Sequence, residues 1–326
     1  MVREIIRNVY EIKVRLPGSP LRDLNSYVIK SADRNLLIDT GFNMPGCLED
    51  LNRGIAALEL DMRKTDIFIT HFHSDHCGLL DKIAEPESNV YMSACDGQLF
   101  YDSLEDKGFW QENIRLYKQE GFPEDVLGSA DRVNPMKVFA AEKPVKITPV
   151  YDGQILTVGD IELQCIDTAG HTPGHVVLYN EKNKLMALGD HVLFDITPNI
   201  TVWTTLRNAL RVYIDNLNYI KKFKVEIPLP GHRHCNCTMA ERIDQLLEHH
   251  ETRLREVIGI IRQNPCINAY DVAKCMDWMI QADSWESFPL KQKIFAFGEA
   301  VSHLYFLEEA GEIKRFVRDG VAVYSE

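Results

Sequence analysis

The chain has 326 residues, of which 45% are hydrophobic and 26% charged, and this composition excludes a disordered or fibrous protein. Its 36 lysines and arginines stand against 48 aspartates and glutamates. The resulting net charge of −12 gives the whole chain no attraction to nucleic acid or anionic membranes. The sequence lacks the roughly 20 consecutive apolar residues of a membrane helix, and its first residues lack the apolar core of a signal peptide, so we expect a cytoplasmic protein.

The first two thirds of the chain alternate strand and helix signals. Strands are expected at residues 4–14, 27–30, 36–38, 66–70 and 89–92, and a helix is expected from Pro45 to about residue 60, with the proline in its first turn. Residues 95–136 instead combine two or three helical patterns with several aromatic side chains, which predicts a helical insert. Strands return at 155–158, 161–167, 176–179, 185–188 and 225–229, with a helix at 204–223.

The last part of the chain has a different pattern. Helices are expected from about residue 239 to 263, at 269–276 and at 290–309, and a hairpin is expected around Asp319-Gly320. We therefore predict two units. Residues 1–239 form a layered α/β unit with the insert at about 95–136, and residues 240–326 form a small, mainly helical unit that resembles a winged helix.

Histidines and aspartates follow several of the expected strands. Seven of them stand out, four in a short motif of the type HxHxDH and three after later strands: His71, His73, Asp75, His76, His171, Asp190 and His232. Because each group comes directly after a strand, all can gather at one edge of a sheet, where loops carry functional groups. Imidazole and carboxylate groups suit zinc, iron, nickel or manganese. The spacing therefore predicts a metal site.

These motifs resemble those of the metallo-β-lactamase superfamily, closest to its glyoxalase II-like hydrolases, over about residues 1–238. The resemblance implies a four-layer αββα sandwich and two divalent metal ions, with zinc expected and iron or manganese as alternatives. It implies that the first ion is bound by His71, His73 and His171. It implies that the second ion is bound by Asp75, His76 and His232, and that Asp190 bridges the two. Asp39, in an Asp-Thr-Gly turn, resembles the family's aspartate that orients a ligand loop.

A pair of divalent ions implies a hydrolytic reaction. Two ions lower the pKa of a shared water toward about 7, so that hydroxide exists at neutral pH and can attack a carbonyl carbon or phosphorus. Asp75 and Asp190 are the expected catalytic carboxylates, with Asp190 orienting the water. We expect a small-molecule or acyl-type substrate, cleaved at a thioester, lactone or other ester.

Three other functions remain open at the sequence level. Mononuclear-iron persulfide dioxygenases share the HxHxDH motif, so this motif alone does not exclude an oxidoreductase. A related branch with a winged-helix-like tail cleaves RNA. In residues 240–326, however, 10 lysines and arginines stand against 15 aspartates and glutamates, a net charge of −5 that argues against a phosphodiesterase or endoribonuclease. A non-catalytic binding module would be expected to have lost ligands, and none is lost here.

The insert and the tail are expected to shape the site. The aromatic residues between Phe100 and Phe122, together with Trp203, either form an apolar lid for an acyl chain or pack the insert onto the sandwich. The tail is expected to pack against the sandwich, to wall the site or to support a homodimer. The eight cysteines are expected to be free thiols. The remaining histidines are expected to have structural or surface roles: His175, His191, His234, His249, His250 and His303.

Overall fold

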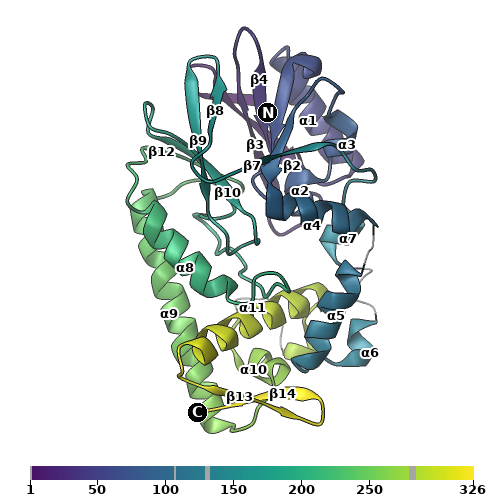
Figure 1. Cartoon of the computed structure of the whole chain (residues 1–326), viewed down its shortest axis with the longest axis vertical. Helices are drawn as coiled ribbons and strands as arrows, with labels where there is room; N and C mark the ends of the chain where they lie inside the picture. The colour runs from purple at the N-terminus through teal and green to yellow at the C-terminus, as the bar shows by residue number, and fades with distance from the viewer. Residues whose placement is uncertain (1, 106–107, 129–132, 279–283) are drawn as a thin grey trace.

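The computed structural model describes residues 2–105, 108–128, 133–278 and 284–326. Two β-sheets lie face to face with helices outside them, as Figure 1 shows, and this is the predicted αββα sandwich. The first sheet has seven strands in chain order. They are β1 (Val2–Ile6), β2 (Val9–Arg15), β3 (Asp23–Ile29), β4 (Asn35–Ile38), β5 (Thr65–Phe68), β6 (Val90–Ser93) and β7 (Ile147–Val150).

The second sheet has five strands in the order β12-β11-β10-β9-β8. They are β8 (Ile155–Val158), β9 (Ile161–Asp167), β10 (Val176–Asn180), β11 (Leu185–Gly189) and β12 (Ile227–Pro230). Strands β4 to β7 are parallel, and β11 is parallel to β12, whereas the other pairs are antiparallel. Both sheets are therefore mixed, and each has parallel strands whose carboxyl ends can carry a site.

The alternation of side chains along each strand builds two separate cores. In β4, Leu36 and Ile38 belong to the core between the sheets, whereas Leu37 belongs to the core beneath the helices. In β10, Leu178 and Val177 divide in the same way. Because both faces of β4 and β10 are covered, these strands are apolar runs, which is the signal that predicted them. The helices on the outer faces are α1 (Pro45–Ala57), α3 (Leu80–Ile83) and α8 (Ala209–Ile220).

The predicted strand at residues 4–14 is wrong. The chain reverses at Arg7 and Asn8, and β1 and β2 pair as an antiparallel hairpin. Asn8 has φ 68°, a left-handed conformation that asparagine adopts more readily than most residues. A second difference is β7, which the sequence analysis missed. The helix predicted at 204–223 begins only at Ala209.

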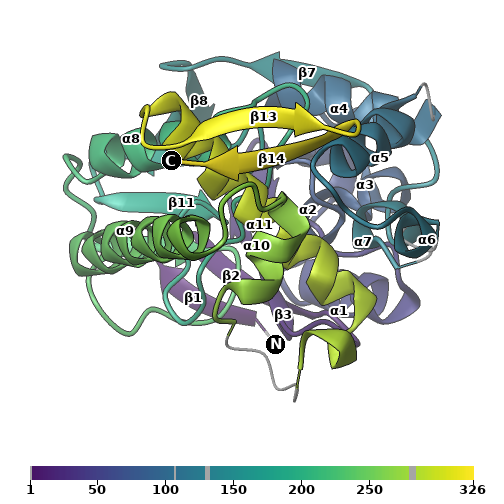
Figure 2. The same ribbon diagram turned by 90° about the horizontal axis from the view of Figure 1, so that it is seen from below.

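The insert and the tail pack together at the end of the sandwich. The insert contains α4 (Ala94–Glu105), α5 (Phe109–Gln119) and α6 (Glu124–Leu127), followed by α7 (Pro135–Val138). The tail contains α9 (Met239–Gln263), α10 (Ala269–Cys275), α11 (Leu290–Glu309) and the hairpin of β13 (Lys314–Arg318) and β14 (Val321–Ser325). Phe122 and Leu127 of the insert share a core with Phe297 and Ala300 of α11. Figure 2 shows α5, α10, α11 and the hairpin side by side.

The tail thus has the predicted helices and closing hairpin, while its likeness to a winged helix and the domain boundary at 239/240 stay predictions. Within the described residues, none of the helices has the length and apolarity that crossing a membrane requires.

Candidate metal centre

The seven predicted site residues come from four loops at one end of the strands. His71 lies three residues beyond β5, and the short helix α2 (Ser74–Cys77), which begins three residues later, contains Asp75 and His76. His171 lies between β9 and β10, Asp190 follows β11, and His232 follows β12. The carboxyl ends of β5, β11 and β12 and the β9–β10 loop meet at this edge. The fold therefore brings together residues that are far apart in the chain.

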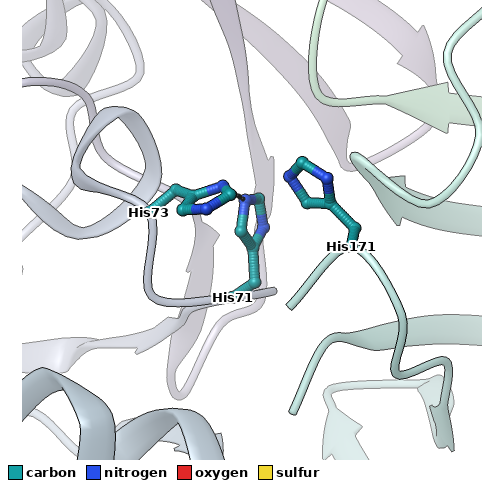
Figure 3. A group of neighbouring side chains, drawn as sticks. All are labelled: His71, His73 and His171. Carbon is teal, nitrogen blue, oxygen red and sulfur yellow. Dashed lines mark hydrogen bonds between the residues drawn. The ribbon is translucent and has the colours of Figure 1, made fainter. Parts of the chain in front are cut away.

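Their ligand atoms form three overlapping groups, within each of which the atoms lie no more than 4.8 Å from one another. These groups are His71, His73 and His171; His71, His76 and Asp190; and Asp75, His76 and His232. Figure 3 shows the rings of the first group turned toward a common point, with His71 Nε2 3.0 Å from His73 Nδ1. All seven residues that the sequence singled out thus lie in one cluster. The middle group, which includes both His71 and Asp190, connects the other two.

The orientation of the rings leaves nitrogen atoms aimed at the centre. His76 Nδ1–H donates to Asp39 Oδ2 at 2.8 Å, His171 Nδ1–H donates to the Asn199 carbonyl at 2.9 Å, and His232 Nδ1–H donates to the Asp23 carbonyl at 2.7 Å. In the neutral ring with Nδ1 protonated, the lone pair that a metal ion can bind lies on Nε2. Among the described residues, the Nε2 atoms of these three histidines and Asp190 Oδ1 are buried without a hydrogen-bond partner.

A metal ion fits this set of donors. Buried polar atoms are nearly always hydrogen-bonded, so four orphaned atoms that converge on one place indicate a ligand. Space at the centre depends on Gly231, because a Cβ at this position would lie 2.5 Å from Asp190 Oδ1 and 2.9 Å from His76 Cε1. The mixture of imidazole and carboxylate donors suits zinc or another first-row ion.

Asp39 holds two parts of the centre in place. Its carboxylate accepts hydrogen bonds from Thr70 N and Thr70 Oγ1, both at 2.9 Å, as well as from His76. Thr70 Oγ1 in turn lies 3.0 Å from His71 Nδ1. Asp39 has φ 59°, a conformation that aspartate tolerates better than most residues. The predicted role of this residue in orienting a ligand loop therefore agrees with its contacts.

Three of the histidines are held neutral. Burial, together with the neighbouring His171, lowers the pKa of His73 to about 3. Burial likewise lowers the pKa of His71 and of His171 below its usual range. At neutral pH these imidazoles carry no proton that a metal ion would have to displace.

The other half of the centre is an ionic cluster. Burial alone would lower the pKa of His232, but Asp190 and Asp75 outweigh it and raise this pKa to about 9. Burial alone would raise the pKa of Asp75, but His232 and His76 outweigh it and lower this pKa to about 2. His232 Nε2 lies 3.3 Å from Asp75 Oδ2 and 3.5 Å from Asp190 Oδ1. Asp75 and Asp190 thus share His232 as a buried partner.

Asp96, a buried residue of α4, was not among the predicted site residues. Its carboxylate accepts hydrogen bonds from Phe72 N at 3.0 Å, Thr172 Oγ1 at 2.6 Å and Gly174 N at 2.6 Å. Burial raises its pKa to about 7 although these hydrogen bonds oppose the shift. Asp96 thereby ties the His71–His76 loop to the His171 loop. No local pattern marks it, because its partners come from two distant segments.

A cavity of about 450 Å³ opens onto the centre. His73, Asp75, His171 and Asp190 lie in its wall, and the rest of the wall is mostly apolar. The aromatic residues predicted as a lid divide between the two expected roles. Four of them line the cavity, namely Phe109, Trp110, Tyr117 and Trp203, whereas Phe100 and Phe122 pack in cores.

The remaining histidines and cysteines take structural or surface positions. His175 Nε2 accepts from the Asp190 backbone N–H at 3.1 Å and so supports that loop. His191, His250 and His303 are buried, while His234 is exposed. All eight cysteines are free.

The comparisons with known proteins agree with this geometry. The family model described as "Metallo-beta-lactamase superfamily" matches residues 20–232, which is more than half of the chain and spans all seven site residues. The chain belongs to the metallo-beta-lactamase superfamily. The glyoxalase II-like branch is a finer assignment that this match does not make.

Members of this superfamily share the fold at low identity. A metallo-beta-lactamase family protein from Thermus thermophilus superposes with a TM-score of 0.82 at 23% identity, covering 99% of this chain and 100% of that one. A "Beta-lactamase-like protein 2 homolog" from Caenorhabditis elegans is 26% identical over 81% of this chain and 72% of its own length. An "Atrochrysone carboxyl ACP thioesterase" from Aspergillus chevalieri is 22% identical over 82% of this chain and 70% of its own length.

Proposed function

We propose that this superfamily member is a dinuclear metallo-hydrolase that cleaves an acyl thioester, a lactone or a related ester. The observation that carries the proposal is the cavity, which is apolar along most of its wall and ends on the seven-residue centre. This wall supports an acyl substrate, because an apolar cavity suits an acyl chain whose carbonyl group would lie beside the metal ligands.

The residues present fit two divalent ions, for which zinc is our proposal. His71, His73 and His171 would hold one ion, Asp75, His76 and His232 the other, and Asp190 would contact both. When bound, such ions supply a Lewis acid and lower the pKa of water, and therefore no serine or cysteine nucleophile is needed.

The protein groups have their own tasks in this reaction. His232 and His76 hold the pKa of Asp190 well below its usual range although burial opposes this, so its carboxylate is ionised at neutral pH and can accept a hydrogen bond from the attacking water. The aromatic wall excludes bulk water from the acyl chain and strengthens electrostatic interactions in the site.

Two further observations support an acyl substrate over a nucleic acid. Among the described residues of the cavity wall, Lys291 is the only lysine or arginine, whereas a phosphodiesterase for nucleic acid is expected to present several cations. One relative carries the name of an acyl carrier protein thioesterase, a description that applies to that protein and is compatible with this cavity.

The test is substitution at the centre. We expect His73→Ala and Asp190→Ala each to reduce hydrolysis of acyl thioesters at least about a hundredfold and to reduce the bound metal, because each removes a ligand. His234→Ala is the matched control, since this histidine is exposed and lies outside the centre. Unchanged activity and metal content in both ligand variants would contradict the assignment. Activity toward phosphodiesters alone, or oxygen uptake with a persulfide, would contradict the proposed reaction.

A further inference from the structure

Lys291 is a cationic residue in the wall of the cavity. Lys291 lies in the first turn of α11, which the tail packs across the open end of the sandwich, and it lines the same cavity as His73 and Asp75. It is half-buried, and its Nζ lies over the Phe295 ring, 5.9 Å from the ring centroid. The cation and the metal centre are thus parts of one cavity.

Within the described part of the chain, the ammonium group of Lys291 has no hydrogen bond or ion pair. The contrast is Lys293, two positions later on the same helix, whose Nζ donates to the Glu286 carbonyl at 3.1 Å. Glu299, the acid of α11 in the cavity wall, is bonded elsewhere, because it accepts a hydrogen bond from Asn199 Nδ2 at 2.9 Å. No carboxylate of the described wall therefore forms an ion pair with Lys291.

An unpaired ammonium group is costly in such surroundings. Burial lowers the pKa of Lys291, and the carboxylate of Asp75 counters this shift across the cavity. A charge without a partner in an apolar wall is stabilised most by an anion that enters the cavity with the ligand. Lysine acts there as a compact point charge, which binds a single carboxylate without demanding a fixed geometry.

We propose that Lys291 determines specificity by binding a carboxylate of the substrate. The substrate is then an acyl thioester or ester that carries an ionised carboxylate in addition to the bond that is cleaved. This inference rests on the proposed function for the ester part, whereas the carboxylate site is a separate property of the cavity.

The kinetic test uses matched thioesters that differ in one carboxylate. In one arm the carboxylate is at the far end of the acyl chain, as in adipoyl against hexanoyl N-acetylcysteamine. In the other arm it is on the thiol, as in hexanoyl mercaptopropionate. We expect Lys291→Gln to lower kcat/KM about ten- to a hundredfold for the charged member of one arm and less than about twofold for the neutral thioester.

The controls separate charge from folding. Lys291→Arg keeps the charge and is expected to retain a large part of the preference. Lys293→Gln removes the charge of a neighbouring residue that does not line the cavity. It is expected to leave kcat/KM unchanged for both the charged and the neutral thioester. An equal effect of Lys291→Gln on charged and neutral thioesters would overturn the proposal.

A binding measurement keeps this proposal distinct from the proposed function. Trp110, Trp203 and Trp278 line the cavity, so tryptophan fluorescence reports on occupancy. We titrate the purified protein with dicarboxylates from succinate to suberate and with monocarboxylates of the same lengths. Both series offer one carboxylate to the metal centre, and only the dicarboxylates offer a second one to Lys291.

We expect at least one dicarboxylate to bind about tenfold more tightly than its monocarboxylate, and we expect Lys291→Gln to abolish the difference. If this preference holds while every ester and thioester stays intact, the proposed function fails and the carboxylate site stands. If thioesters are hydrolysed but no dicarboxylate is preferred, the carboxylate site fails and the proposed function stands.

Discussion

At the scale of single residues, hydrogen bonds from the Nδ1 atoms of three histidines orient their rings toward the centre. Asp39, the Asn199 carbonyl and the Asp23 carbonyl each accept a hydrogen bond from an Nδ1–H group, and this fixes which nitrogen faces the site. These acceptors come from three separate segments of the chain, namely the start of β3, the turn after β4 and the loop after β11. Their positions therefore determine the orientation of three of the ligand rings.

Asp39→Asn tests this point. The change keeps a side chain that tolerates the left-handed conformation, but it replaces the acceptor of the His76 proton with a neutral amide. We expect metal affinity to fall about ten- to a hundredfold, measured by competition with a chelator. Asp61→Asn is the control, because this aspartate lies outside the centre and pairs with Arg63. Equal affinity in Asp39→Asn and the wild type would show that Asp39 does not position the ligand.

Glu299 predicts a pH dependence of stability. Burial raises its pKa from 4.5 to about 6, although Arg253 and the hydrogen bond from Asn199 oppose the shift. The folded state therefore binds this proton more tightly than the unfolded state does. The stabilising contribution is complete below pH 4.5 and is lost as the pH rises through 6.

Glu299→Gln removes this ionisation and keeps an oxygen that can accept from Asn199. We compare the free energy of unfolding of the variant with that of the wild type at pH 4.5 and at pH 7.5. We expect this difference to shift in favour of the variant by about 1–2 kcal/mol from the lower to the higher pH. Urea unfolding at both pH values measures the gain. A difference between variant and wild type that is the same at both values would refute this account of Glu299.

At the scale of elements, one buried carboxylate joins the insert to the tail. Glu120, at the end of α5, accepts hydrogen bonds from Tyr305 of α11 at 2.8 Å, from Arg315 of β13 at 2.7 Å and from Tyr324 of β14 at 2.5 Å. Glu120 is fully buried. This contact fixes α5, which carries Trp110 and Tyr117 into the cavity wall.

Glu120→Ala is expected to lower the free energy of unfolding by about 3–5 kcal/mol, because it leaves the partly buried Arg315 without its partner. Glu120→Gln, which keeps the shape and two of the acceptor contacts, is expected to cost less. Urea unfolding monitored by circular dichroism measures both. A loss below about 0.5 kcal/mol in Glu120→Ala would mean that the insert and tail are held by their apolar core alone.

The order of the elements was largely predictable, because apolar strands and amphipathic helices leave local signals. The hairpin at Asn8 was missed because one long alternating stretch hides a turn of two residues. The packing of the insert against α11 could not be predicted, since it depends on contacts between residues far apart in the chain, such as Phe122 and Phe297.

At the scale of the whole molecule, the sandwich supplies the centre, and the insert and tail together enclose the space above it. The HxHxDH motif made the seven-residue cluster predictable, because its spacing is local and its three partners follow strands. Asp96, Asn199 and Lys291 carry no such local signal. Their relation to the site arises only when the fold brings α4, the loop after β11 and α11 around the centre and its cavity.

The most direct test of metal-dependent acyl hydrolysis is one titration of the purified protein. Metal is removed with a chelator and returned as zinc, while thioester hydrolysis and metal content are measured in the same samples. The account predicts that hydrolysis disappears with the metal and returns in full as about two ions bind per chain. Thioester hydrolysis that persists in metal-free protein, or its absence at full metal occupancy, would contradict it.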